Sequence, residues 1–141
     1  MYNSLNIYIE RGEFTFNVSD NLNNQCNAPK HSSGVYLIYK EKVSESNLVY
    51  IGISGREGTN GEIIHRKDGI KGRLVSGKQF GEPRRRSWPK KMIESDIELI
   101  IIKWYVTFGR YNQDFPRPIE NGLLSNYLNI HGKLPEWNNE I

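Results

Sequence analysis

The stretch that decides the fold is residues 34–53, in which two apolar runs flank a polar segment. The runs read GVYLIY at residues 34–39 and LVYIGI at residues 48–53. Both are rich in β-branched and aromatic residues, which favour strands. The polar residues between them suit a hairpin connection. We therefore predict two paired antiparallel strands, with Tyr36 on the first and Tyr50 on the second.

The composition fits one globular domain. The chain has 141 residues, 37% of them hydrophobic, and a net charge of +3, and this length can bury a core without disulfides. Cys26 is the only cysteine, so no intrachain disulfide can form, and we expect a reducing, cytoplasmic compartment. No apolar run approaches the roughly 20 residues that span a bilayer, and the N-terminal residues lack a signal-peptide pattern, so we expect no membrane association.

The N-terminal third precedes the two tyrosine strands. Residues 6–16 alternate apolar and polar side chains around a glycine, which predicts a small hairpin or an edge addition to the main sheet. Residues 20–33 are rich in Asn and Ser and are expected to form a loop.

The remaining chain alternates between helical and strand patterns. Residues 70–76 predict a short helix, and a second is expected to start near Ser87, with Pro89 in its first turn. Residues 97–106 are almost continuously apolar, which indicates a central strand buried on both faces. Residues 118–130 have the spacing of an amphipathic helix.

This order of elements predicts an α+β fold. We expect a small, mostly antiparallel central sheet of about three strands, flanked by helices, with an N-terminal hairpin addition. Residues 34–141 would form this domain, and residues 1–33 would be an extension of it.

Three further motifs follow the tyrosine strands in a fixed order. They are GIKGRL at residues 69–74, PIENGLL at residues 118–124 and LPEWN at residues 134–138. Together with the tyrosine strands, over residues 34–138, they resemble the GIY-YIG nuclease family. The resemblance implies that family's fold and a metal-dependent endonuclease that hydrolyses DNA phosphodiester bonds, such as a standalone restriction enzyme. It also implies Mg²⁺ as the cofactor, with Mn²⁺ as a substitute.

The resemblance and the side-chain chemistry assign the main catalytic roles. Glu120 is the expected metal ligand, because one carboxylate with waters and a phosphate oxygen can complete a Mg²⁺ shell. Taken alone it would be better explained as complementing the helix dipole, and the upstream motifs reverse this preference. Arg73 is the expected phosphate clamp, since a planar guanidinium can hold two phosphate oxygens, and Arg66 is its rival. Tyr50 is the expected general base or water orienter, with Tyr36 in support.

The cation that a tyrosine base requires is left open. A phenol titrates near ~10, so a cation must lie beside it for it to act as a base near neutral pH. Lys71 and Lys67 are the candidates, and His65 is an alternative proton relay. Two positions depart from the family pattern. Ile53 stands where a basic residue often follows the second motif, and Gly77 where many members carry a His or Tyr one helical turn after the arginine.

Positive charge is concentrated between residues 56 and 91 and indicates a nucleic-acid surface. Such a cluster neutralises phosphates and releases counterions, although by itself the charge is equally well explained as a solvated face. The expected substrate-binding residues are Arg66, Lys67, Lys78, Arg84 and, near the C-terminus, Asn138. DNA is the expected partner, and cutting of a duplex would favour a homodimer.

Two alternatives were weighed against the nuclease. GRLVSGK at residues 72–78 matches a phosphate-binding loop, but Gln79 stands where that motif needs Ser or Thr, and no strand leads into it. A catalytically inactive DNA- or RNA-binding module on the same fold would keep the basic surface without the chemistry. The intact set of four candidate catalytic residues favours the enzyme.

Overall fold

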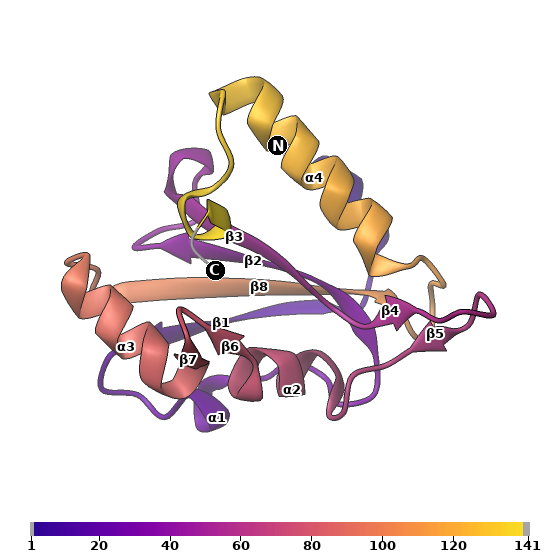
Figure 1. Ribbon diagram of the computed structural model, residues 1–141, viewed down its shortest axis with the longest axis horizontal. Helices are drawn as coiled ribbons and strands as arrows, with labels where there is room; N and C mark the ends of the chain where they lie inside the picture. Colours follow the sequence, from indigo (N-terminus) through magenta and orange to yellow (C-terminus); the bar gives the residue numbers. More distant parts are fainter. Residues whose placement is uncertain (1, 140–141) are drawn as a thin grey trace.

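A four-stranded sheet organises the chain in the computed structural model, which describes residues 2–139 (Figure 1). The strand order is β1-β8-β2-β3, and every neighbouring pair is antiparallel. The strands are β1 (Arg11–Asn17), β2 (Ser33–Lys40), β3 (Leu48–Ser54) and β8 (Leu99–Phe108). The α+β class is thus confirmed. The sheet is larger than the three strands expected, because the N-terminal segment contributes β1.

The N-terminal segment joins the sheet as a single edge strand. The predicted hairpin is wrong, and the alternative of an edge addition is confirmed, because β1 pairs with β8 from Arg11 opposite Tyr105 to Asn17 opposite Leu99. The residues before it form the 3-10 helix η1 (Asn3–Ile7).

The two tyrosine strands pair as predicted. In the register of β2 with β3, Tyr36 lies opposite Gly52 and Ile38 lies opposite Tyr50. The connection between the strands contains the 3-10 helix η2 (Glu45–Asn47). Strand β8 also has its predicted central place, between β1 and β2.

Helices cover both faces of the sheet. The loop after β1 contains the one-turn helix α1 (Leu22–Gln25). Helices α2 (Gly69–Ser76) and α3 (Arg84–Glu94) follow β3, and α4 (Pro116–His131) follows β8. In Figure 1, α1, α2 and α3 lie on one side of the sheet and α4 lies on the other.

Helix α3 begins earlier than the sequence predicted. The expected start near Ser87 is wrong, and Pro89 lies inside the helix. The earlier start has a packing reason. Arg84, Trp88 and Met92 are all buried, and their spacing of four residues places them on one face of a helix.

Short elements complete the chain. Two small hairpins pair β4 (Arg56–Glu57) with β5 (Ile63–Ile64) and β6 (Lys78–Gln79) with β7 (Glu82–Pro83). The 3-10 helix η3 (Glu136–Asn139) ends the described chain. Among residues 2–139, no helix is both long and apolar enough to cross a membrane.

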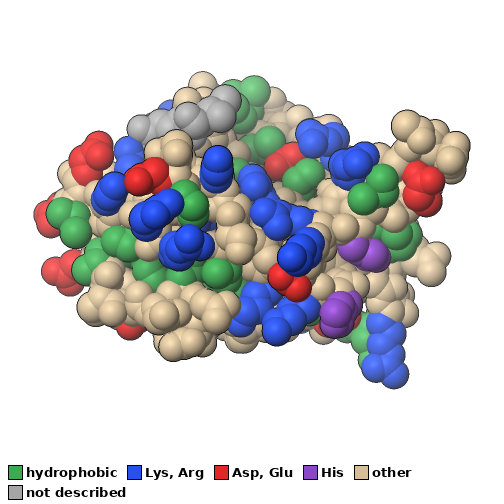
Figure 2. All heavy atoms as spheres, turned by 60° about the horizontal axis from the view of Figure 1, so that its bottom comes forward, with side chains coloured by type: hydrophobic (Ala, Val, Ile, Leu, Met, Phe, Trp, Pro, Cys, Tyr) green, Lys and Arg blue, Asp and Glu red, His purple; other side chains and the backbone are tan. Residues whose placement is uncertain are grey.

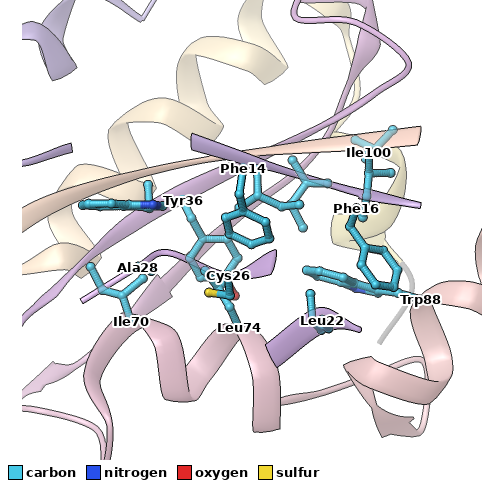
Figure 3. Close-up of a cluster of buried hydrophobic side chains, with 14 of the residues drawn as sticks. Phe14, Phe16, Leu22, Cys26, Ala28, Tyr36, Ile70, Leu74, Trp88 and Ile100 are labelled. Carbon is cyan, nitrogen blue, oxygen red and sulfur yellow. The ribbon is translucent and has the colours of Figure 1, made fainter. Parts of the chain in front are cut away.

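The core consists of two clusters, one on each face of the sheet. On one face, Tyr36 and Phe14 of the sheet pack with Ile70 and Leu74 of α2 and Trp88 of α3 (Figure 3). On the opposite face, the alternate residues of β2 pack with α4; this cluster includes Val35, Leu37, Ile51, Leu123 and Tyr127. The tyrosine side of the sheet is therefore the side that α2 and α3 cover.

Candidate active site

Tyr36 and Tyr50 lie side by side on paired strands. Their ring centroids are 6.0 Å apart, and Tyr36 is fully buried whereas Tyr50 is partly exposed. A Cβ at Gly52 would lie 2.5 Å from Cζ of Tyr36 and 2.6 Å from Cε2 of Tyr50. Glycine at this position of the second motif therefore makes the space that both rings occupy.

Arg73 reaches the two tyrosines from helix α2. Electrostatic attraction to Tyr36, followed by that of Tyr50 and hydrogen bonds to both hydroxyls, raises the pKa of the Arg73 guanidinium, and burial opposes this increase. The predicted phosphate clamp thus lies against both predicted tyrosines.

Arg84 lies at the centre of this group, where the sequence did not place it. It was expected to bind substrate on the surface, yet its side chain is fully buried. Its Nη2 donates to the hydroxyl of Tyr36 at 2.8 Å, and its Nη1 donates to the carbonyl oxygen of Arg73 at 2.7 Å. Its Nε donates to Oε1 of Gln79 at 3.1 Å, an oxygen that also accepts Nε1 of Trp88 at 2.9 Å.

Glu120 joins the group from helix α4. Its side chain is 15% exposed. Burial raises the pKa of the Glu120 carboxyl, whereas the charges of Arg117 and Arg73 lower it. Because its charge also acts on Tyr50, Glu120 shares one electrostatic environment with the tyrosines and Arg73.

The hydroxyl of Tyr50 is held in its neutral form. Burial, with a contribution from Tyr36, raises the pKa of Tyr50 to about 12, although the charges of Arg84 and Arg73 lower it. A phenol with this pKa is protonated at neutral pH, so it can donate and accept hydrogen bonds but is not itself an anion.

A pocket of about 340 Å³ opens beside Tyr50 and Arg73. The β6–β7 hairpin contributes four of its residues, Lys78, Gln79, Phe80 and Gly81, and the C-terminal segment contributes Trp137 and Asn138. Four residues predicted for the site therefore line one pocket: Tyr50, Arg73, Lys78 and Asn138.

Asn138 fixes the C-terminal segment to the edge strand β3. Its Oδ1 accepts the backbone N–H of Ile51 at 3.0 Å, and its Nδ2 donates to the carbonyl oxygen of Ile51 at 2.9 Å. The side-chain amide of Asn138 thus holds the C-terminal segment in place as one wall of the pocket.

The other predicted catalytic groups have partners elsewhere. The Nζ of Lys71 donates to the carbonyl oxygens of Cys26 at 2.8 Å and Asn23 at 3.0 Å. Nδ1 of His65 is hydrogen-bonded to Oγ of Ser33 at 2.7 Å. The cations that act on Tyr50 are instead Arg84 and Arg73.

The chemistry of Glu120 fits a Mg²⁺ ion that keeps several waters. Among residues 2–139, no three His, Cys, Asp or Glu side chains form a group that could hold a metal. Mg²⁺ is commonly bound by one or two carboxylates together with waters and substrate phosphates. Burial disfavours the ionised form of Glu120, and a divalent cation would offset this cost.

Basic side chains lie around the site on the face that carries α2 and α3. Figure 2 shows many Lys and Arg side chains gathered on this side, with a few acidic ones among them. The exposed basic residues of this part of the chain are Arg56, Lys67, Lys78, Arg85, Arg86 and Lys90, and Arg66 is partly exposed. Lys90 forms an ion pair with Glu82 at 2.8 Å. These side chains face solvent, where a polyanion can reach them.

Comparison with known proteins gave no match to any family model, any curated protein or any solved structure. Function is therefore inferred from these side chains.

Proposed function

We propose that this protein is a metal-dependent endonuclease of the GIY-YIG type that hydrolyses phosphodiester bonds in DNA. The observation that carries the proposal is the convergence of four side chains that are far apart in the sequence. The rings of Tyr36 and Tyr50 lie 6.0 Å apart, Arg73 is hydrogen-bonded to both hydroxyls and lines one pocket with Tyr50, and Glu120 lies within electrostatic range of Arg73 and Tyr50. A tyrosine pair, a guanidinium and one mostly buried carboxylate at the edge of a basic surface suit phosphodiester hydrolysis better than binding alone.

Arg73 would hold the scissile phosphate. It lines the pocket beside Tyr50, and its guanidinium can offer two parallel N–H donors to phosphate oxygens. Charge that develops on these oxygens in the transition state is stabilised by donors that are already in place. Tyr36 and Tyr50 provide this preorganisation, because both hydroxyls are hydrogen-bonded to the Arg73 side chain.

Tyr50 would position the attacking water. Its hydroxyl is neutral at pH 7, because its pKa is raised to about 12, so it would accept a hydrogen bond from the water rather than start as a phenolate. The water attacks phosphorus and gives a proton to solvent, while the bond between phosphorus and the leaving oxygen breaks and that oxygen takes up a proton from solvent. The neutral phenol cannot take this proton; Arg84 and Arg73 lower the pKa of Tyr50 and would increase the small phenolate fraction that can.

Glu120 would bind a Mg²⁺ ion, which Mn²⁺ could replace. When bound, such an ion supplies Lewis-acid stabilisation of phosphate oxygens and a water of lowered pKa. The residue's own contribution is a mostly buried carboxylate on helix α4.

A DNA- or RNA-binding module that has lost catalysis is the alternative. The observation that favours it is the high pKa of Tyr50, about 12, which leaves the site without a ready base. In this alternative, nucleic acid binds to the same basic face, but Glu120 has no function. The two functions therefore differ in what loss of Glu120 would do.

The deciding experiment is cleavage of supercoiled plasmid with Mg²⁺, Mn²⁺ or EDTA. Wild type is compared with Glu120→Ala and Arg73→Ala, and Lys42→Ala is the control for loss of an exposed basic side chain outside the site. We expect metal-dependent nicking that only the first two variants lose, by about 100-fold or more, the size of effect of removing a preorganised transition-state contact. Linear product would indicate cutting of both strands by paired copies, and discrete bands would indicate sequence specificity.

Two results would contradict the proposal. DNA that is shifted in a binding gel but never cut, under any of the three conditions, would favour the inactive module. Cutting that survives Glu120→Ala would remove the proposed metal ligand.

A further inference from the structure

We propose that Arg84 is a positioning residue of this site. It holds the hydroxyl of Tyr36 and the backbone of Arg73 in one fixed arrangement, and it occupies the space that Gly77 leaves open beside them. This role rests on the proposed nuclease function and goes beyond the residues that the motif pattern identifies.

The hydrogen bonds of Arg84 join elements that come from three parts of the chain. The guanidinium of Arg84, at the start of α3, donates to the hydroxyl of Tyr36 on β2. It also donates to the backbone carbonyl oxygen of Arg73 in the last turn of α2. A third bond, to Gln79 on β6, fixes the plane of the guanidinium. Because five N–H donors of an arginine lie in one rigid fork, a shift of any partner would break at least one of these bonds.

Gly77 creates the space for this arrangement. A Cβ at this position would lie 2.2 Å from the carbonyl oxygen of Arg73, the acceptor that Arg84 uses. The same Cβ would lie 3.0 Å from Nη1 of Arg84 and 3.0 Å from Nη1 of Arg73. A side chain four positions after Arg73 would thus clash with the carbonyl oxygen that accepts from Arg84 and would press on both guanidinium groups. Gly77 therefore leaves room for the hydrogen bond between Arg84 and the carbonyl oxygen of Arg73.

The charge of Arg84 is not neutralised by a carboxylate. Among residues 2–139, no Asp or Glu lies within ion-pair distance of it. Its guanidinium carbon instead lies 5.4 Å from the ring centroids of Tyr36 and Trp88, and 5.8 Å from that of Tyr50. A buried charge without an opposite charge is costly. Such costs are typical of functional sites, and here the positive charge lies next to the place proposed for the scissile phosphate.

A purely structural role would make Arg84 a support for α3. Loss of Arg84 would then lower stability without a specific effect on the chemical step. Trp88 is a suitable comparison, because it is also fully buried and donates to the same oxygen of Gln79. Its hydrogen bond, unlike those of Arg84, reaches neither Tyr36 nor Arg73.

The test is steady-state cleavage of plasmid DNA by Arg84→Met, Arg84→Lys and Trp88→Phe, measured well below each melting temperature. Methionine keeps most of the volume of arginine but has no donor. We expect Arg84→Met to lower kcat by about 100-fold with KM changed by less than about threefold, the pattern of an interaction needed only in the transition state. Arg84→Lys keeps a positive charge and a donor, so its kcat should fall less than that of Arg84→Met. Trp88→Phe should cut within about threefold of wild type.

A readout that does not depend on cleavage is exchange of the Arg84 side-chain protons, followed by NMR. We expect slow exchange in wild type and faster exchange in Tyr36→Phe, which removes the acceptor of Nη2. Fast exchange in wild type would overturn the positioning role.

The other outcomes are also decisive. A folded Arg84→Met with wild-type kcat, or an equal loss of kcat in Trp88→Phe, would overturn the role and leave the nuclease intact. If Arg84→Met does not fold, Arg84→Lys decides: a kcat reduced by about tenfold at constant KM supports the role, and an unchanged kcat overturns it. A wild-type protein that cuts no DNA would instead overturn the proposed function, and this role with it.

Discussion

The two faces of the sheet bury similar side chains but differ in what is buried with them. Toward α4, the cluster around Leu37, Ile51 and Leu123 is made of apolar and tyrosine side chains. Toward α2 and α3, the apolar cluster is larger, but Arg84 and Gln79 are buried beside it and connected by hydrogen bonds. We infer that the first face mainly stabilises the fold, whereas the second gives up part of its stability to hold a site.

Tyr36 and Leu37 are sequence neighbours that belong to the two different faces of the sheet. Both are fully buried in β2, and the two-residue period of a strand directs them to opposite faces. The faces can therefore be tested separately by substitutions only one residue apart.

The largest effect is expected on the apolar face. Leu37→Ala should lower the free energy of unfolding by about 3 kcal/mol, the usual cost of emptying a buried leucine site. Urea denaturation would measure this loss. Because Leu37 belongs to the cluster opposite the tyrosines, cleavage per folded molecule should stay within about twofold of wild type. A tenfold loss of cleavage per folded molecule would mean that the apolar face also serves the site.

The next effect tests the packing of the site itself. Gly52→Ala should lower stability by about 2 kcal/mol, since overpacking of a filled core costs about 1–3 kcal/mol. Its Cβ would meet both Tyr36 and Tyr50 at under 3 Å, so cleavage should also fall by about 100-fold, because small misplacement of reacting groups is costly. Thermal melts and plasmid nicking measure the two effects.

Gly122→Ala is the matched control on the other face. Nothing lies within 4 Å of the Cβ that this change adds, and alanine favours a helix interior over glycine by about 1 kcal/mol. Helix α4 should therefore gain stability with no change in cleavage. Equal damage from both alanines would contradict the division between the faces.

Local pattern predicted much of the fold and part of the site. The paired tyrosine strands, helix α2 and helix α4 were predicted from residue types and spacing that act within one segment. The four candidate catalytic side chains, Tyr36, Tyr50, Arg73 and Glu120, come from these segments. Tyr36, Tyr50 and Arg73 are neighbours, and Glu120 lies within electrostatic range of Tyr50. The partner strand of β1 depends on contacts across most of the chain, and the sequence left it open.

Arg84 could not be recognised within its run of three arginines. Arg84, Arg85 and Arg86 look alike as a basic surface segment, yet the first is buried and the other two are exposed. The available signal was the spacing of Arg84 from Trp88 and Met92, which is helical. It was obscured because Pro89 was assigned to the first turn of a helix, where proline is favoured.

A smaller effect concerns the free energy of unfolding at alkaline pH. Burial raises the pKa of Tyr50 to about 12, from 10.0 in the unfolded chain. The folded state therefore favours the neutral phenol. This contribution is fully present below pH ~10 and is lost as pH rises toward ~12. Tyr50→Phe lacks it, so between pH ~9 and ~11 the variant should lose about 1 kcal/mol less stability than wild type, after allowance for partial exposure. Urea denaturation at the two pH values measures the difference, and parallel losses would refute it.

The smallest effect is a gain in stability from removing the proposed metal ligand. Burial raises the pKa of the Glu120 carboxyl, so the folded state favours its protonated form, and the ionised form present at pH 7 costs stability. Glu120→Gln removes this cost, although it also removes the ion pair with Arg117, and should raise the melting temperature at pH 7. The exposed Glu98→Gln is the control and should leave the melting temperature unchanged.

The pH and metal dependence of this gain identify its origin. The difference between Glu120→Gln and wild type should close as pH falls to about 4, where the carboxylate of the unfolded chain is protonated as well. Added Mg²⁺ should raise the melting temperature of wild type alone, because a ligand stabilises only a protein that binds it. A gain that persists at pH ~4 would not come from the buried charge. A variant that is more stable and inactive would mean that this carboxylate is retained for chemistry and that the fold does not need it.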